Sequence, residues 1–139
     1  LTLLARLSFP AGKKGDLMKN ILVVEDSPTM IQLITFTVKR IAGINVIEAK
    51  DGVEALKKIT SEKIDLMLAD INMPLMDGLK LVGLIKGNPD LRHIPVIIIT
   101  TEGAKEDRER AIKIGADAYL SKPIQTQELV RLVNSFIGP

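Results

Sequence analysis

The chain has 139 residues, a length typical of one domain that buries its own core, and the absence of cysteine excludes disulfides and thiolate metal sites. Its composition, 46% hydrophobic and 26% charged, is typical of a globular protein, and the lack of cysteine fits a reducing, cytoplasmic location. No apolar run is long enough to cross a bilayer. The net charge of +2 comes entirely from residues 1–17, so we expect neither direct nucleic-acid binding nor a membrane partner.

Residues 1–17 differ from the pattern that follows them. The segment LTLLARLSFPAGKKGDL lacks the basic start and the small-residue cleavage site of a signal peptide. Met18 comes directly before the first apolar run. We interpret residues 1–17 as an extension outside the domain, against the alternative of a genuine N-terminal arm, and residues 18–139 as the domain.

Short runs rich in Val, Ile and Leu recur along the rest of the chain. They predict strands at NILVVE (20–25), INVIEA (44–49), DLMLAD (65–70), IPVIIIT (94–100) and AYLS (118–121). Three of these runs are almost continuously apolar, which is typical of strands buried on both faces. The pattern therefore indicates a parallel sheet covered by helices.

Helical patterns separate the predicted strands. Ser27, followed by Pro28, is a predicted cap of the first helix, and Thr126 of the last. The predicted core side of the first helix is Ile31, Ile34, Val38 and Ile41, and that of the last is Leu129, Val130, Val133 and Phe136. Val53, Leu56 and Ile59 mark a second helix, and Leu81, Val82 and Ile85 mark a third. The segment 104–114 is charged over its first two turns, and only Ala111, Ile112 and Ile114 anchor it. We expect it to be among the more mobile parts of the fold.

Five βα units in series predict a doubly wound α/β domain with helices on both faces of the sheet. Such sheets place their sites beyond the carboxyl ends of the strands, at the switch point in strand order. The polar residues at these ends are Glu25, Asp26, Asp70, Thr100 and Lys122. If the strand order is 2-1-3-4-5, these five residues converge on one shallow pocket.

Taken singly, each of these residues has an ordinary structural explanation, such as a helix start for Asp26 or a solvated charge for Lys122. Together, three carboxylates on one edge repel one another and raise each other's pKa. One ammonium group leaves a formal charge of −2, which one divalent cation neutralises. Oxygen donors without His or Cys favour Mg²⁺. His93 precedes the fourth strand at the opposite end of the sheet, and we interpret it as structural or surface.

A carboxylate held beside a divalent cation and an ammonium group can attack phosphorus and form an acyl phosphate. Phosphoryl transfer needs mainly positioning and charge neutralisation. Here Asp70 is the candidate nucleophile, and Lys122 can pair with a phosphoryl oxygen. The Thr100 hydroxyl and the backbone N–H groups after Asp70 can bind another oxygen.

Four motifs in order, at βα spacing, carry a resemblance to a known family. They are ILVVEDSP, DLMLADINMPLMDG, IPVIIITT and GADAYLSKP, and the likeness extends over residues 19–137. The chain resembles the receiver domain of two-component response regulators, in particular the single-domain, chemotaxis-type receivers. That resemblance implies a flavodoxin-like fold with a five-stranded parallel sheet in the order 2-1-3-4-5.

The resemblance also implies the role of each site residue. Asp70 is the residue that is phosphorylated, and Thr100 and Lys122 bind the phosphoryl group. The implied Mg²⁺ ligands are Asp26, Asp70, the backbone carbonyl of Asn72, and Glu25 acting through water. Tyr119 is the aromatic residue that changes rotamer when Thr100 moves.

The implied activity is that of a signalling switch and not of a classical enzyme. The domain would catalyse its own Mg²⁺-dependent phosphorylation and dephosphorylation at Asp70, with a sensor histidine kinase or phosphotransfer protein as donor. It would signal through the face of helix 104–114, the fifth strand and the last helix, to a downstream target or to an output domain outside this chain. The family also has a cis peptide at the position of Lys122–Pro123. Thr101 departs from the family, which usually has Ala or Gly there, and its larger side chain would narrow access to the phosphoryl group.

Three other functions share parts of this pattern. A flavin carrier of the same fold needs a Ser/Thr/Gly-rich phosphate cradle after the first strand, where this chain has the acidic EDSPTM. A haloacid-dehalogenase-type phosphatase has its nucleophile after the first strand, as D-x-D, and needs a longer chain. The remaining alternative is a receiver-like protein-binding module that acts without phosphorylation.

Overall fold

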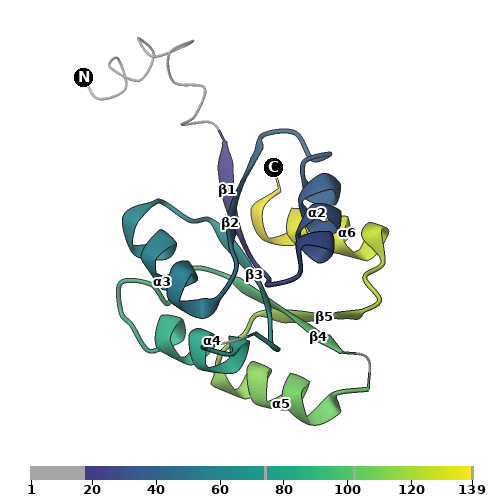
Figure 1. Cartoon of the computed structure of the whole chain (residues 1–139). Helices are drawn as coiled ribbons and strands as arrows, with labels where there is room; N and C mark the ends of the chain where they lie inside the picture. Colours follow the sequence, from purple (N-terminus) through teal and green to yellow (C-terminus); the bar gives the residue numbers. More distant parts are fainter. Residues whose placement is uncertain (1–17, 74, 102, 139) are drawn as a thin grey trace, which may run out of the picture.

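The computed structural model describes residues 18–73, 75–101 and 103–138 (Figure 1). The predictions about residues 1–17 therefore lie outside the described residues. Strands and helices alternate along the chain: β1 (Lys19–Val24), α2 (Pro28–Val38), β2 (Ile44–Ala49), α3 (Gly52–Ser61), β3 (Leu66–Asp70), α4 (Gly78–Lys86), β4 (Val96–Thr101), α5 (Lys105–Ile114), β5 (Ala118–Lys122) and α6 (Thr126–Ile137). Within these ranges no helix has the length and apolar character that a membrane crossing requires.

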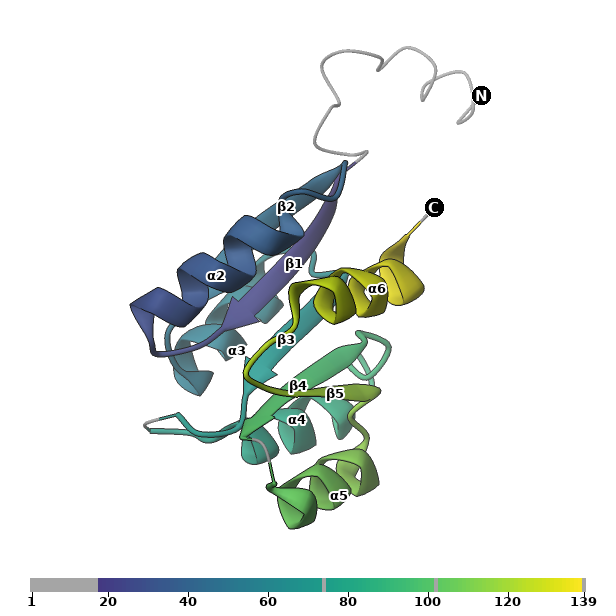
Figure 2. The ribbon, with the colours of Figure 1, turned by 90° about the vertical axis from the view of Figure 1, so that its right-hand side faces the viewer.

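The five strands form one parallel sheet in the order β2-β1-β3-β4-β5, which confirms the predicted order. Helices α2 and α6 cover one face of the sheet, and α3, α4 and α5 cover the other (Figures 1 and 2). Side chains alternate between the faces along each strand, so there are two buried clusters. Leu22 and Val24 belong to the cluster under α3, α4 and α5, whereas Ile21 and Val23 belong to the cluster under α2 and α6.

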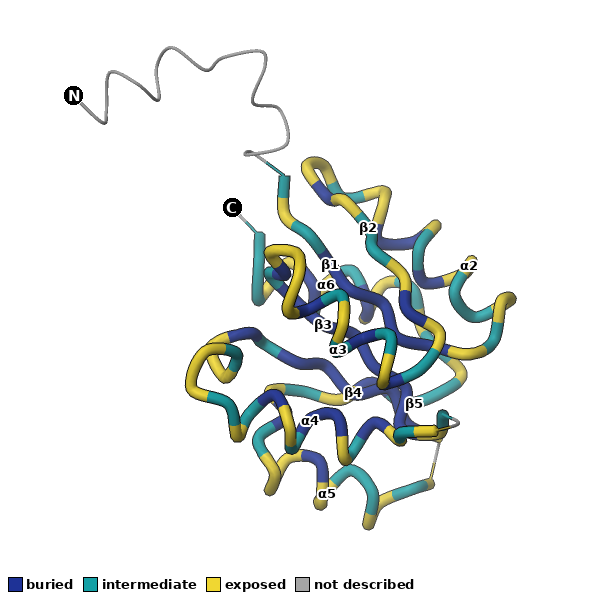
Figure 3. Tube along the Cα trace, turned by 60° about the vertical axis from the view of Figure 1, so that its left-hand side comes forward, coloured by how far each residue is buried: buried dark blue, intermediate teal, exposed yellow. Residues whose placement is uncertain are grey.

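The central strand β3 is buried along its whole length, from Leu66 to Asp70. It pairs with β1 on one side and β4 on the other, and the tube in Figure 3 is dark blue along β3 and along most of these two neighbours. The strand is therefore held by hydrogen bonds to a neighbour on each side. Its last residue is a carboxylate held by a rigid element, which positions a functional group better than a loop does.

Of the two helix caps predicted from the sequence, one is confirmed and one is wrong. Ser27 caps α2 as predicted, because its hydroxyl accepts a hydrogen bond from Met30 N (3.3 Å) and Pro28 occupies the first turn. The predicted cap at Thr126 is wrong. Gln125 has extended backbone angles and its carbonyl accepts the hydrogen bond of Leu129 N (3.0 Å), so Thr126 is already the first helical residue.

Helix α5 is anchored even more weakly than its sequence indicates. Only Ala111 is buried, whereas Ile112 and Ile114 are 44% and 38% exposed. The helix lies beside α4 and β4 at the edge of the domain (Figure 2). Little apolar burial resists its displacement, which fits the expectation that this segment is mobile.

A partly buried ion pair links α4 to the strands beneath it. The Lys86 ammonium group lies 2.9 Å from Asp117 Oδ2 and donates hydrogen bonds to the carbonyls of Ile94 (2.7 Å) and Arg92 (3.1 Å). Asp117 Oδ2 also accepts the backbone N–H of Val96 (2.8 Å). All three ammonium donors are thus in use, and they tie the end of α4 to the segment just before β4 and to Asp117, which precedes β5.

Replacing Lys86 with methionine should lower the free energy of unfolding by about 1.5–3 kcal/mol, because Asp117 and two carbonyls would lose a charged partner. Urea denaturation monitored by circular dichroism measures the loss. Lys80→Met is the matched control, since Lys80 is exposed on the same helix and should change the value by less than about 0.5 kcal/mol. Equal effects of the two variants would contradict this role for Lys86.

Candidate functional site

The polar residues singled out at the strand ends meet at the carboxyl edge of the sheet. Glu25 and Asp26 follow β1, Asp70 ends β3, and Lys122 ends β5. Thr100 lies near the end of β4. The strand order reverses between β1 and β3, and the helices that follow these two strands lie on opposite faces of the sheet (Figure 2), which is the switch point where doubly wound sheets place their sites.

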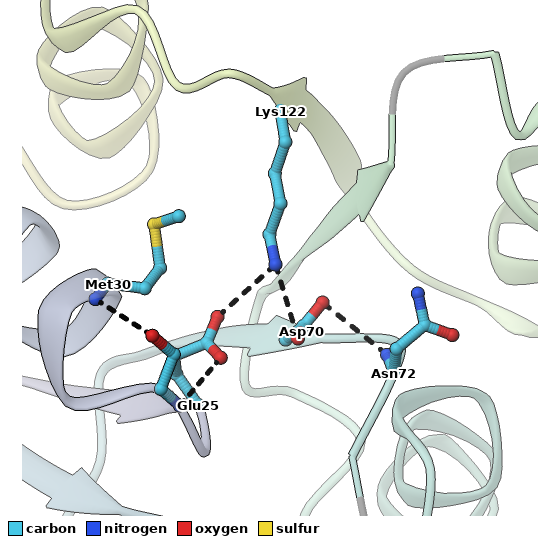
Figure 4. A network of polar contacts seen from close by, with 6 residues as sticks. Glu25, Met30, Asp70, Asn72 and Lys122 are labelled. Carbon is cyan, nitrogen blue, oxygen red and sulfur yellow. Dashed lines mark hydrogen bonds and ion pairs between the residues drawn. The ribbon is translucent and has the colours of Figure 1, made fainter.

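Lys122 bridges two buried carboxylates. Its Nζ lies 3.4 Å from Asp70 Oδ2 and 3.6 Å from Glu25 Oε1. Figure 4 shows the side chain reaching from the end of β5 toward both acids. The side chain of Lys122 is 27% exposed, whereas those of Glu25 and Asp70 are 1% and 3% exposed. The ammonium group therefore lies at the solvent side of a carboxylate pair that is almost sealed from water.

Backbone N–H groups fix the orientation of both carboxylates. Ser27 N donates to Glu25 Oε2 (3.1 Å), and Asn72 N donates to Asp70 Oδ1 (3.4 Å) (Figure 4). The chain after Asp70 then turns back, and Gly78 N donates to the carbonyl of Ile71 (2.8 Å). These bonds hold the acids in place before any ligand arrives.

Burial is the largest influence on the pKa values of Asp70 and Glu25. Loss of solvent raises the pKa of Asp70 above its ordinary value of 3.8, and the Lys122 charge opposes that rise only in part. Burial also raises the pKa of Glu25, and the neighbouring Asp70 carboxylate adds to the effect. The site holds more negative charge than its one ammonium group balances, and a further cation would stabilise it.

The acidic residues fit a magnesium ion. Glu25, Asp26 and Asp70 offer carboxylate oxygens that lie within 4.8 Å of one another. Asp26 is exposed and accessible to an ion, whereas Glu25 Oε1 is buried and has no hydrogen-bond partner within the ranges that the structure describes. The Lys122 ammonium group, 3.6 Å from this oxygen, is too distant for a good hydrogen bond, and hard oxygen donors of this kind suit Mg²⁺.

The two predicted switch residues are placed differently. Thr100 is fully buried, and its hydroxyl has no hydrogen-bond partner in the described part of the chain. Tyr119 is 44% exposed and its ring lies outside the pocket, with the Arg108 guanidinium carbon 5.2 Å from the ring centroid. The structure thus gathers Glu25, Asp26, Asp70, Thr100 and Lys122 at one edge and leaves Tyr119 apart from them.

The cis peptide at Lys122–Pro123 is present, as the resemblance implied.

Gly78 shapes the pocket, and sequence reasoning did not single it out. A Cβ atom on Gly78 would lie 2.5 Å from the Asp70 carbonyl oxygen and 2.8 Å from Ile71 Cα. The first turn of α4 therefore packs directly on the backbone that carries Asp70. The sequence signal was the Asp77-Gly78 pair, where Asp77 caps α4 by accepting from Lys80 N (2.8 Å).

Replacing Asp70 with asparagine should raise the free energy of unfolding at neutral pH without Mg²⁺ by more than the ~0.5 kcal/mol of an ordinary surface substitution. The pKa of Asp70 is higher in the folded state than in the unfolded state. Protonated Asp70 therefore contributes its full share to the free energy of unfolding below about pH 3.8, and this contribution is lost as the pH rises through the pKa of the folded state. Asparagine stays neutral at every pH. The free energy of unfolding of Asp70→Asn should therefore exceed that of wild type by an amount that grows as the pH rises from the unfolded to the folded pKa of Asp70, and that is constant above it.

Urea titrations of both proteins between about pH 3 and pH 8 measure this difference. Adding Mg²⁺ should stabilise the wild type more than Asp70→Asn, because an ion that binds only the folded state raises its stability. If Asp70→Asn were more stable than wild type mainly in acid, or at no pH, Asp70 would not be a buried carboxylate whose charge destabilises the fold.

Comparisons with known proteins agree with this architecture. Residues 21–134 match the response regulator receiver domain family. Among curated proteins, the chain is 37% identical to a chemotaxis protein CheY homolog of Campylobacter jejuni, over 85% of this chain and 92% of that protein. It is 34% identical to the polar-differentiation response regulator DivK of Brucella anthropi, over 86% of this chain and 97% of that protein.

Solved structures give the same result. The chemotaxis response regulator CheY4 of Vibrio cholerae aligns with a TM-score of 0.79 at 30% identity, over 86% of this chain and 99% of that one. The receiver domain of the sensor histidine kinase PA1611 of Pseudomonas aeruginosa, with a magnesium ion in its active-site cleft, also aligns with a TM-score of 0.79 at 30% identity. This alignment covers 88% of this chain and 99% of that one. The strand order, the acidic pocket and these matches together show that the chain belongs to the response regulator receiver domain family of two-component signalling.

Proposed function

We propose that this receiver domain is a phosphorylation-activated switch that accepts a phosphoryl group on Asp70. The observation that carries the proposal is the position of Asp70 at the tip of a buried strand, with the Lys122 ammonium group 3.4 Å from its Oδ2 atom. A carboxylate fixed in this way is an oriented nucleophile, and the neighbouring cation neutralises charge that develops on a phosphoryl oxygen.

In the proposed reaction, an Asp70 oxygen attacks the phosphorus of a phosphohistidine on a sensor histidine kinase or phosphotransfer protein. A P–O bond to Asp70 forms as the P–N bond to histidine breaks, and the histidine leaves with a proton on its ring. Lys122 pairs with one phosphoryl oxygen, and the Thr100 hydroxyl donates to another. Attack of water on the phosphorus of the acyl phosphate later breaks the P–O bond to Asp70, releases inorganic phosphate and restores the carboxylate.

Magnesium fits the acidic end of the pocket. Asp26 and Asp70 would hold the ion with the backbone carbonyl of Asn72, and Glu25 would act through water. When bound, the ion would neutralise the excess carboxylate charge and bind a phosphoryl oxygen. The magnesium in the cleft of the PA1611 receiver supports the choice of ion. The cysteine-free composition fits a reducing cytoplasm, where we place this reaction.

The proposed output is a change in the face formed by α5, β5 and α6. A phosphoryl group on Asp70 offers the buried Thr100 hydroxyl a charge-assisted hydrogen bond, which draws Thr100 toward the pocket. Tyr119 then turns inward to fill the space behind Thr100, and the weakly anchored α5 follows. A phosphoryl group that favours this state by a few kcal/mol changes the face seen by a downstream target or an output domain.

The test is to add beryllofluoride and Mg²⁺, which mimic the phosphoryl group, and to follow backbone NMR shifts. Large shifts are expected at Asp70, at Thr100 and through residues 105–119, and Asp70→Asn should show none of them. Shifts confined to the surroundings of Asp70 would refute the switching part of the proposal. No shifts at all would favour a binding module that acts without phosphorylation.

A further inference from the structure

Tyr119 has a cationic neighbour in the outward position. It is the single tyrosine of the chain, lies on the edge strand β5, and is 44% exposed. The guanidinium carbon of Arg108, on α5, lies 5.2 Å from the centroid of its ring. A guanidinium at this distance is attracted to the ring face, and Arg also stacks its flat side on aromatic rings. The contact joins α5 to β5.

Arg108 differs from Lys105 and Arg110, two of the three other basic residues of α5, in where its charge lies. Lys105 pairs with Glu109 (3.9 Å), and Arg110 pairs with Asp107 (3.8 Å), both along the surface of the helix. Arg108 lies instead against Tyr119, and the two side chains line the same surface hollow of about 420 Å³. Of the four basic residues of α5, Arg108 therefore lies against the aromatic ring and two others are in local ion pairs, while Lys113 lines the same hollow.

The sheet register shows which way the ring can turn. Tyr119 pairs with Ile98, and Thr100 pairs with Ser121, so Tyr119 and Thr100 emerge from the same face of the sheet. Ile98 belongs to the buried cluster on the α3–α4–α5 face, which places both residues under α5. A rotamer change that turns the Tyr119 ring toward Thr100 takes it away from the Arg108 guanidinium. In the structure the cation–π contact is made with the ring in the outward position.

We propose that Arg108 is a positioning residue that holds Tyr119 outward and so sets how readily the domain switches. The inference rests on the proposed function, in which Tyr119 turns inward when Asp70 is modified. An interaction made in only one of two states favours that state, and its removal shifts the population toward the other. The usual strength of a partly exposed cation–π contact corresponds to an about two- to fivefold change in the ratio of the inward to the outward population.

The test titrates beryllofluoride, at fixed Mg²⁺, into wild type, Arg108→Ala and Arg110→Ala, and follows the Tyr119 ring resonances by NMR. A ligand that selects the minor state binds more tightly in proportion to the population of that state. Arg108→Ala should therefore reach half-saturation at an about two- to fivefold lower beryllofluoride concentration. Arg110→Ala removes the same charge from the same helix and should match wild type. Urea denaturation of each variant confirms that it is folded.

Equal midpoints for wild type and Arg108→Ala, or a higher midpoint in Arg108→Ala, would overturn the inference. An equal decrease in Arg110→Ala would also overturn it, because net charge and not the ring contact would then be responsible. These results leave the proposed function intact, since wild type still responds to beryllofluoride. A wild type whose backbone and Tyr119 resonances do not respond at all would overturn the proposed function, and the role of Arg108 with it.

Discussion

Replacing Lys122 with alanine should slow the labelling of Asp70 by acetyl phosphate and Mg²⁺ by about 10²–10³-fold, the usual effect of removing one preorganised donor from a developing anion. Lys122 Nζ already lies 3.4 Å from Asp70 Oδ2, so it is positioned before the phosphoryl group arrives. The small-molecule donor isolates the chemistry of the pocket from recognition of a kinase. Phosphoprotein accumulation over time, measured by intact-mass spectrometry, gives the rate.

Lys63→Ala is the matched control for Lys122→Ala. Lys63 is 83% exposed and has its own carboxylate partner, Asp65, at 4.0 Å, but it lies before β3 at the other end of the sheet. Its removal should leave the labelling rate unchanged. Similar rates for Lys122→Ala and Lys63→Ala would show that Lys122 acts as a surface charge and has no part in phosphoryl transfer.

Replacing Gly78 with alanine should lower the free energy of unfolding by about 1–3 kcal/mol, as overpacking does, and should slow Asp70 labelling as well. The added Cβ would meet backbone atoms of Asp70 and Ile71, which cannot move aside as a flexible side chain can. Either α4 or the end of β3 must shift, and the second shift moves the acceptor carboxylate away from Lys122. Urea denaturation and the acetyl phosphate assay measure the two effects.

Gly83→Ala separates this close approach from the general effect of a glycine in α4. A Cβ on Gly83 has an ordinary contact of 3.6 Å with Ile114 Cγ2. Alanine should therefore stabilise the helix there by up to about 1 kcal/mol, because it has the higher helix propensity. If Gly78→Ala matched Gly83→Ala in stability and in labelling, the packing of α4 against Asp70 would not be what fixes the acceptor.

The sheet and its acidic edge could be predicted because they depend on short-range features of the sequence. Continuous Ile, Val and Leu runs mark buried parallel strands, and the residue after each run then falls at the same edge. Asp70 and Lys122 were predicted to meet on that ground, and they do.

The features that were missed depend on tertiary distances. The contact of Arg108 with Tyr119 joins a helix to a strand through a long side chain with many rotamers, which no spacing rule specifies. The need for glycine at position 78 comes from the backbone of another element. Ile112 was expected to anchor α5 because it is apolar, but the helix presents only a narrow face to the protein.

The central claim is that Asp70 is the phosphoryl acceptor, and locating the label tests it most directly. The protein is incubated with acetyl phosphate and Mg²⁺, and the acyl phosphate is reduced with borohydride, which converts a phosphorylated aspartate to homoserine. Peptide mass spectrometry then locates the reduced residue. We predict homoserine at position 70 and at no other position, with none formed when Mg²⁺ is withheld. Homoserine at another aspartate, or none at position 70 in fully folded protein, would contradict the account.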